Sequence, residues 1–202
     1  MSFIRALIVL HRAYRHFPLR ARVHILIRFL TCPFLRVVRY VPAGARLLDL
    51  GAGHGVFSVL ARDRGAHPIV VDPDARKHPM IVGYDNCIRG KFDAVAIIDV
   101  LYKIPMAEWD ALLDRVHERL KSGGLLIIKE HDPTARFKQW INRKQESLAT
   151  AAHLTLGHAF SYETPAAFAA RLRAHGFEVV EQKRIDFGYP HPHIIYVSER
   201  QQ

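Results

Sequence analysis

Cysteine is scarce in this sequence, and its scarcity excludes two kinds of stabilising framework. The 202 residues contain only Cys32 and Cys87, with no C-x-x-C pair between them. Two isolated cysteines indicate neither a structural zinc site nor a disulfide scaffold. We therefore expect a cytoplasmic protein of one domain, long enough to fold around an ordinary hydrophobic core.

Long hydrophobic runs are also missing. The first apolar run, residues 6–10, is too short for the core of a signal peptide, and charged residues interrupt the sequence after it. Nowhere do the roughly 20 consecutive apolar residues of a membrane-spanning helix occur. We expect no processed leader and no membrane span.

Acidic residues are absent from positions 1–42, which nevertheless carry eight arginines. These are Arg5, Arg12, Arg15, Arg20, Arg22, Arg28, Arg36 and Arg39. The remaining 160 residues hold 21 basic side chains (29 minus 8) and 19 acidic ones, so they are nearly neutral. A basic surface for a partner, if the protein has one, therefore lies in the first 42 residues.

The periodicity of this segment predicts two amphipathic helices, 3–17 and about 19–30, separated by Pro18 and followed by Pro33. Three interpretations remain open: a helical cap on the rest of the chain with solvated arginines, contact with an anionic membrane, and RNA binding. RNA surfaces need aromatic side chains for stacking, whereas these helices are mainly aliphatic. We expect a cap that also touches the inner face of the membrane as a peripheral protein.

A glycine-rich turn follows the first apolar strand of the remaining sequence. The strand, 46–50, contains Asp49, and Gly51, Gly53 and Gly55 come next at alternate positions before an apolar helical pattern. Glycines let a ligand approach the backbone, and the helix start offers free N–H groups. A dinucleotide fingerprint would need Gly or Ala at position 56, where Val56 stands. The spacing therefore disfavours NAD.

Strands and helices then alternate, which is typical of a parallel sheet covered by helices. The second strand, 68–71, ends at Asp72, whose carboxylate can accept two ribose hydroxyls; the alternative is a simple turn before Pro73. A buried strand over 92–102 follows, then helix 106–120, which the glycine pair 123–124 ends, and then strand 125–130.

Residues 46–132, with the D-x-G-x-G-x-G turn, the acid at 72 and the glycine pair, resemble class I S-adenosyl-L-methionine (SAM)-dependent methyltransferases. The resemblance implies an α/β fold with a Rossmann-like seven-stranded sheet in the order 3-2-1-4-5-7-6, in which strand seven is antiparallel. It also implies two regions: a helical cap over residues 1–42, and a methyltransferase domain over 43–202 with an insertion, 133–164, on the substrate side.

The resemblance also implies which residues bind the cofactor, SAM. They are Asp49, Gly51, Ala52, Gly53, Gly55, Asp72, Pro73, Asp85, Asp99 and Val100. The match at Asp85 is loose, because Gly83-Tyr84-Asp85 departs from the usual pattern, and Asn86 is an alternative. The turn that follows strand four in nucleobase methyltransferases, with its two prolines, is missing, which disfavours nucleobase chemistry.

Histidines supply the candidate general bases. His131 follows strand five and is the first candidate, with Tyr102, His158 and His191 behind it. In the loop 188–193, His191 and His193 alternate with Pro190 and Pro192, and this histidine pair lacks an evident third ligand. We therefore expect no metal there.

We expect a methyltransferase that acts on a small acceptor of aromatic or lipid-linked type, with O-methylation favoured over C-methylation. Two alternatives stand beside it. One is an RNA or ribosome-associated methyltransferase that uses the arginine-rich segment. The other is a SAM-binding regulator without catalytic activity.

Overall fold

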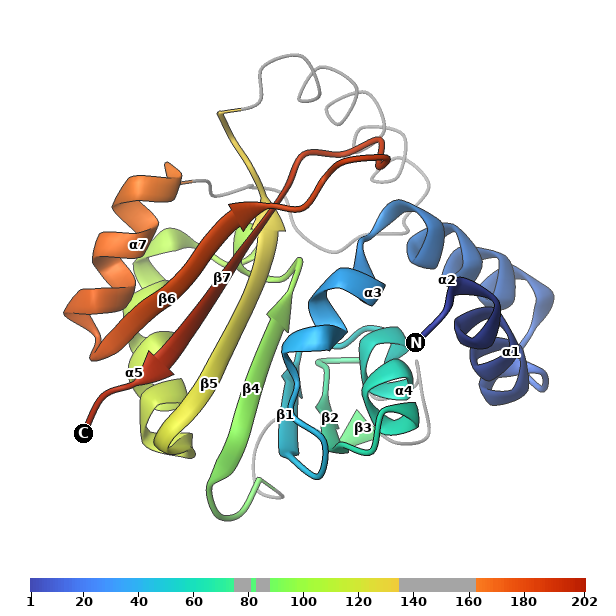
Figure 1. Cartoon of the computed structure of the whole chain (residues 1–202), viewed down its shortest axis with the longest axis horizontal. Coiled ribbons are helices and arrows are strands. Elements are labelled where there is room, and N and C mark those ends of the chain that lie inside the picture. Colours follow the sequence, from blue (N-terminus) through green and yellow to red (C-terminus); the bar gives the residue numbers. More distant parts are fainter. Residues whose placement is uncertain (75–80, 83–87, 135–162) are drawn as a thin grey trace.

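The chain forms a seven-stranded sheet with helices on both sides, as the computed structural model in Figure 1 shows. The structure describes residues 1–74, 81–82, 88–134 and 163–202. The strands are β1 (Arg46–Leu50), β2 (His67–Val71), β3 (Ile81–Val82), β4 (Phe92–Ile98), β5 (Leu120–His131), β6 (Phe177–Arg184) and β7 (His193–Arg200). The helices are α1 (Phe3–Tyr14), α2 (Leu19–Thr31), α3 (Phe34–Val37), α4 (Val56–Asp63), α5 (Trp109–Arg119) and α7 (Pro165–Ala174), with short 3-10 turns at Val38–Tyr40, Leu101–Lys103 and Met106–Glu108.

The predicted strand order is confirmed: β3-β2-β1-β4-β5-β7-β6. Strands β1 to β5 are parallel to one another, and β7 is antiparallel to both β5 and β6. Six strands have five residues or more, whereas β3 has two. The parallel strands end at one edge of the sheet, which is where ligands bind in open α/β folds.

Two predicted helix ends were wrong. Helix α1 ends at Tyr14 instead of residue 17, because Pro18 disfavours helical geometry in the residue before it. Helix α5 ends at Arg119, before the glycine pair that we expected to terminate it. Leu120 is already extended and pairs with Phe92, so β5 begins directly after the helix and contains both glycines.

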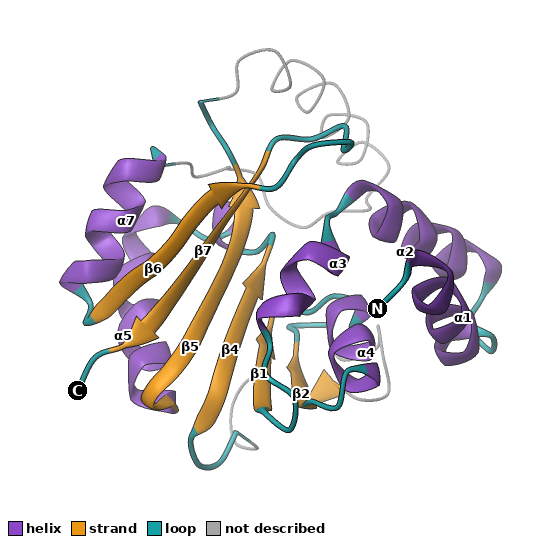
Figure 2. Ribbon diagram, in the orientation of Figure 1, coloured by secondary structure: helices purple, strands orange, loops and turns teal. Residues whose placement is uncertain are grey.

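The two faces of the sheet carry separate hydrophobic cores, because neighbouring residues of a strand point to opposite sides. Leu47 packs with α1, α2, α3 and α4, whereas Leu48 packs with α5 and α7. Figure 2 shows the two sets of helices on opposite sides of the strands. Since Ala6, Leu10 and Phe29 belong to the first core, the N-terminal helices share their core with the sheet.

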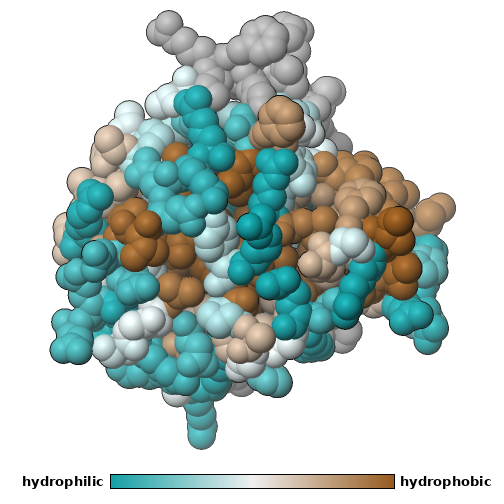
Figure 3. Space-filling view, viewed as in Figure 1, coloured by the Kyte–Doolittle hydropathy of each residue, from teal (hydrophilic) through white to brown (hydrophobic). Residues whose placement is uncertain are grey.

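The outer surface of α1 and α2 is apolar. On α2, Val23, Leu26, Ile27 and Leu30 are exposed, while the other side of the helix is buried through Ile25 and Phe29. In Figure 3 hydrophobic residues gather on the side of the molecule where α1 and α2 lie. These helices therefore have one apolar side in the core and another outside it.

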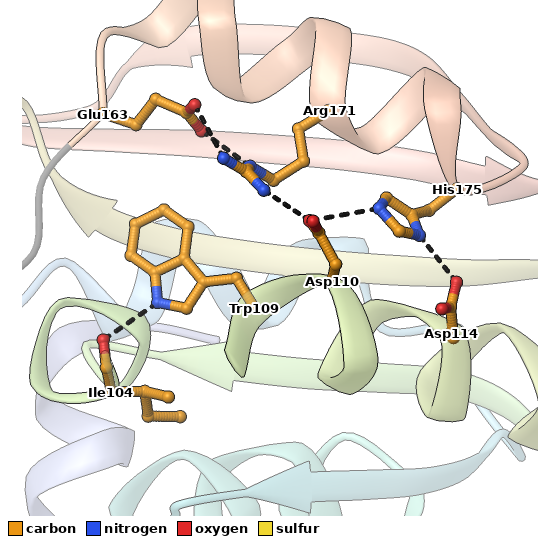
Figure 4. Close-up of polar contacts among 7 residues, drawn as sticks. All are labelled: Ile104, Trp109, Asp110, Asp114, Glu163, Arg171 and His175. Carbon is orange, nitrogen blue, oxygen red and sulfur yellow. Dashed lines mark hydrogen bonds and ion pairs between the residues drawn. The ribbon is translucent and has the colours of Figure 1, made fainter. Parts of the chain in front are cut away.

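On the opposite face, polar contacts hold α5 and α7 together (Figure 4). Arg171 of α7 contacts Asp110 of α5 and pairs with Glu163 at 3.0 Å, and His175 lies 2.6 Å from Asp114. The indole of Trp109 packs edge-on against Phe168 beneath these pairs. These pairs hold α5 and α7 together on one face of the sheet, beside strands β4 to β6. The carboxyl edge of the sheet is formed with the other elements.

Candidate active site

A cleft of about 240 Å³ lies over the carboxyl ends of β1, β2 and β4. Its floor includes Asp49 and the glycine turn, and Asp72 and Asp99 stand on either side after the neighbouring strands. The cleft therefore lies where the strand order reverses between β1 and β4, as Rossmann-like folds place their ligand sites. Helix α2 contributes His24, Ile25 and Arg28 to its wall.

The glycine turn needs glycine for two different reasons. Gly51 has φ +69°, and a Cβ there would lie 2.5 Å from a methyl carbon of Val100. Gly53 has φ +58°, and a Cβ there would meet no atom within 4 Å. Gly51 therefore allows β1 and the segment after β4 to pack closely, whereas Gly53 leaves space on the cleft side.

This difference gives a matched pair of substitutions. Gly51→Ala should lower the thermal midpoint of unfolding more than Gly53→Ala, because both strain the backbone and only the first collides with Val100. Gly51→Ala with Val100→Ala should recover part of the loss. Differential scanning calorimetry measures the three variants, and equal midpoints for the single variants would contradict the packing role of Gly51.

Asp49 is the buried acid of the cleft. Its Oδ2 accepts a hydrogen bond from Ser58 Oγ at 2.6 Å, and its Oδ1 has no partner among the described residues. Burial, together with the nearby Asp72, raises the pKa of Asp49 to about 7 against the opposing hydrogen bond from Ser58. A buried carboxylate oxygen without a donor is costly, so this atom marks where a ligand N–H would bind.

Asp72 lies across the turn from Asp49. Its Oδ2 accepts the Gly53 N–H at 2.8 Å and its Oδ1 accepts the Asp74 N–H at 2.9 Å. Each carboxylate oxygen keeps a second lone pair, so Asp72 can still accept from a ligand hydroxyl. It lines the cleft as predicted, whereas Pro73 is exposed and is not among the lining residues.

Asp99 lies at the centre of a buried ionic cluster. Arg28 of α2 pairs with its Oδ2 at 2.8 Å, and Lys129 of β5, fully buried, contacts its Oδ1. Burial alone would raise the pKa of Asp99, but Lys129 and Arg28 bring it well below its ordinary value. Asp99 also has φ +56°, a rare conformation for a non-glycine residue, which the surrounding contacts maintain.

The described candidate bases form one stack. The rings of Tyr102 and His131 are 5.5 Å apart and nearly parallel, and those of His131 and His191 are 5.8 Å apart and equally so. Tyr102 lines the cleft, and His131 lies behind it with Nε2 3.7 Å from Asp99 Oδ1. Burial lowers the pKa of His131 to about 3, against the opposing effect of Asp99, so the imidazole is neutral at pH 7.

His193 belongs to a set of three ligand types that does not include His191, the other member of the histidine pair. It is the cross-strand neighbour of His131, and ligand atoms of Asp99, His131 and His193 lie within 4.8 Å of one another. The set has the donor types of a metal site. However, Lys129 and Arg28 already contact both oxygens of Asp99, and a divalent ion would have to displace them.

Several other predicted residues can be placed. Ala52 lines the cleft, Gly55 is the left-handed residue before α4, and Val100 packs against Gly51 without lining the cleft. Asp85 and His158 lie outside the described residues.

Three charged residues near the cleft were not predicted: Arg28, Lys129 and Glu130. Glu130 accepts the backbone N–H groups of Val100 and Leu101 at 2.9 and 2.8 Å. Burial and the nearby Asp99 together raise the pKa of Glu130 to about 8. A lysine and a glutamate in a buried strand are the signal that could have indicated Lys129 and Glu130. Nothing in the sequence distinguishes Arg28 from the other seven arginines of the segment.

The fold, the glycine turn and the acids after β1 and β2 together define a class I methyltransferase architecture. The family described as a methyltransferase domain matches residues 22–182 of this chain. The chain belongs to this methyltransferase family.

Among curated relatives, the ubiquinone biosynthesis O-methyltransferase of Xylella fastidiosa is 29% identical over 104 residues. The match covers 43% of this chain and 42% of that protein, so the chain matches less than half the length of its relative.

Solved structures share the fold. The 1,6-didemethyltoxoflavin-N1-methyltransferase of Burkholderia thailandensis, with bound S-adenosylhomocysteine, is 16% identical and matches with a TM-score of 0.63 over 100% of this chain and 92% of its own. The magnesium protoporphyrin IX methyltransferase of Synechocystis PCC 6803, also with bound S-adenosylhomocysteine, is 17% identical. It matches with a TM-score of 0.59 and covers 98% of this chain and 95% of that protein. These comparisons confirm the predicted fold class and support SAM as the cofactor.

Proposed function

We propose that this chain binds SAM in the cleft over β1 and transfers its methyl group to the hydroxyl of a small aromatic or lipid-linked acceptor beside Tyr102 and His131. The observation that carries the proposal is the Tyr102–His131–His191 stack, which begins at the cleft wall and continues away from it. The chain thus has a cofactor cleft and a neutral imidazole next to each other.

The residues of the cleft suit SAM by their chemistry. The unpartnered Oδ1 of Asp49 would accept an N–H of the methionine ammonium group, and Asp72 would accept the ribose hydroxyls. The space beside Gly53 lets a ligand lie against the backbone of the turn. SAM supplies an electrophilic methyl group on a positively charged sulfur, which leaves as a neutral thioether.

The protein then has to orient the acceptor and receive one proton. As the oxygen of the acceptor bonds to the methyl carbon, its O–H becomes strongly acidic. A base with a low pKa can take that proton, and His131 stays neutral and able to do so at pH 7. Asp99, 3.7 Å from His131 Nε2, would stabilise the imidazolium that forms. Tyr102, stacked on His131, would position the acceptor ring.

An aromatic acceptor is favoured by what surrounds this end of the cleft. Tyr102 lines the cleft itself, and its ring can stack on an aromatic acceptor there. Oxygen as the methylated atom is favoured by the name of the Xylella relative.

The proposal also places the protein in a reducing cytoplasm, since Cys32 is a buried free thiol.

The test is transfer of labelled methyl groups from SAM to a panel of phenols, catechols and prenylated phenols, with the products identified by mass spectrometry. We expect methyl ethers from at least one class. Carbon-methylated products would reassign the acceptor atom, and label appearing only in RNA would favour the RNA methyltransferase. SAM binding without transfer to any component of a cell extract would favour the non-catalytic regulator.

A further inference from the structure

We infer that the outer surface of α1 and α2 binds an anionic lipid bilayer, and that the groove between the two helices receives an acyl chain from it. None of the helices in the described part of the chain is long and apolar enough to cross a bilayer. The inference concerns a surface at the interface of the membrane, and it does not depend on which acceptor the cleft binds.

Exposed apolar side chains concentrate on these two helices. Ten large apolar side chains are exposed among the described residues, and eight of them lie on α1 and α2. They are Phe3, Ile4, Ile8, Leu19, Val23, Leu26, Ile27 and Leu30. Ile4 and Leu19 are 70% and 73% exposed. Figure 3 shows the apolar area on this side of the molecule. Contiguous apolar surface of this kind marks an interaction site.

A groove runs between the helices next to this surface. It has a volume of about 340 Å³, and Leu7, Leu10, Leu19 and Leu26 are among its apolar lining residues. The polar side chains in its lining come from His11, Tyr14 and Arg22. A groove with aliphatic walls and few polar groups suits a hydrocarbon chain better than a nucleotide base, which needs aromatic stacking and hydrogen bonds.

The charged residues beside the apolar surface of α2 indicate which kind of partner this surface binds. Helical periodicity places Arg20 on one flank of the stripe of Leu19, Val23 and Leu30, and Arg22 on the other. Arg12, Arg20 and Arg22 form no ion pair with another described residue, and residues 1–42 contain no acid. Aliphatic side chains with arginines at their border match acyl chains beneath anionic headgroups.

The bilayer surface connects directly with the cleft. Ile25 lines both the groove and the cleft, and Tyr14 donates a hydrogen bond to the carbonyl oxygen of His54 in the glycine turn at 2.6 Å. A membrane on α1 and α2 would therefore lie beside the cofactor site. An amphipathic acceptor would then enter the cleft from the bilayer, and this consequence alone rests on the proposed function.

Vesicle flotation tests the inference. The wild-type chain should float with vesicles that contain phosphatidylglycerol, remain unbound with pure phosphatidylcholine, and dissociate at high salt. The double variant Val23→Asp with Ile27→Asp should lose flotation. The matched control, Val180→Asp with Phe187→Asp, changes the two large exposed apolar residues that the structure describes outside α1 and α2, and it should keep flotation. Arg12→Gln with Arg20→Gln should weaken binding roughly 10–30-fold, since each basic side chain near an anionic surface contributes on the order of 1 kcal/mol.

Fluorescence locates the acyl chain. Tryptophan placed at the groove by Val23→Trp should be quenched by lipids brominated along their acyl chains, whereas Val180→Trp should not.

SAM affinity, measured by calorimetry on every variant, separates loss of membrane binding from loss of the fold or of the proposed function. The inference would be overturned by no flotation at low salt, by equal loss in the control variant, or by equal quenching at both tryptophans. Tight RNA binding or dimerisation through Val23 and Ile27 in place of flotation would also overturn it.

Discussion

Replacing His131 by alanine should lower turnover by roughly 10²-fold or more while the affinity for SAM stays unchanged. His131 lies behind Tyr102 and does not line the cleft, so its loss should leave cofactor contacts in place. The measurement is steady-state turnover with a hydroxyl acceptor, together with calorimetric binding of SAM to the same variant.

His67→Ala is the control, because His67 is exposed at the start of β2 and is distant from the stack in the fold. It should behave as the wild-type chain does. If His131→Ala retains full turnover, the proton passes to another group, and His191→Ala, which changes the ring stacked on His131, is the next variant to measure. Unchanged turnover in both would remove the histidines from the reaction.

Asp49→Asn should weaken SAM binding roughly 10–100-fold, because a charge-assisted hydrogen bond contributes about 1.5–3 kcal/mol. The neutral amide can still accept the hydrogen bond from Ser58, so the change removes mainly the charge from the cleft. Asp114→Asn, at an exposed position of α5, is the matched control and should bind SAM as tightly as the wild-type chain. Isothermal titration calorimetry measures both.

The pH dependence of SAM binding is a more specific test of the role of Asp49. Since burial raises its pKa to about 7, this carboxyl is largely protonated below that pH in the free protein. An ammonium group binds the ionised form, so the affinity for SAM should rise as pH increases through about 7 and level off above it. The Asp49→Asn variant should lack this rise over the same interval. A wild-type affinity that is flat between about pH 6 and pH 8 would contradict the role of Asp49.

The strands and the cofactor turn could be predicted because their signals are local. The run from Arg46 to Leu50 was placed without error, since an apolar strand followed by alternating glycines has few other conformations available. Asp72 could be placed for the same reason, at the end of the next apolar run. The helix end at Arg119 could not, because a long-range pairing between Leu120 and Phe92 overrides the glycine signal after it.

The cluster around Asp99 shows what a sequence does not reveal. Arg28, Asp99 and Lys129 come from three distant segments, and only the docking of α2 on the sheet brings them together. His131 could be named as a candidate base and His193 as one of the loop histidines, but their pairing across β5 and β7 depends on the register of an antiparallel strand. The sequence therefore predicts the helical cap but not its contribution to the ionic cluster.

Isothermal titration calorimetry with SAM, S-adenosylhomocysteine and NAD tests the central claim most directly, namely that the cleft over β1 is a SAM site. We expect micromolar binding of the first two ligands and none of NAD, because Val56 replaces the third glycine of a dinucleotide turn and because Asp49 offers an unpartnered carboxylate oxygen. Binding of NAD with no binding of SAM or S-adenosylhomocysteine would contradict the account.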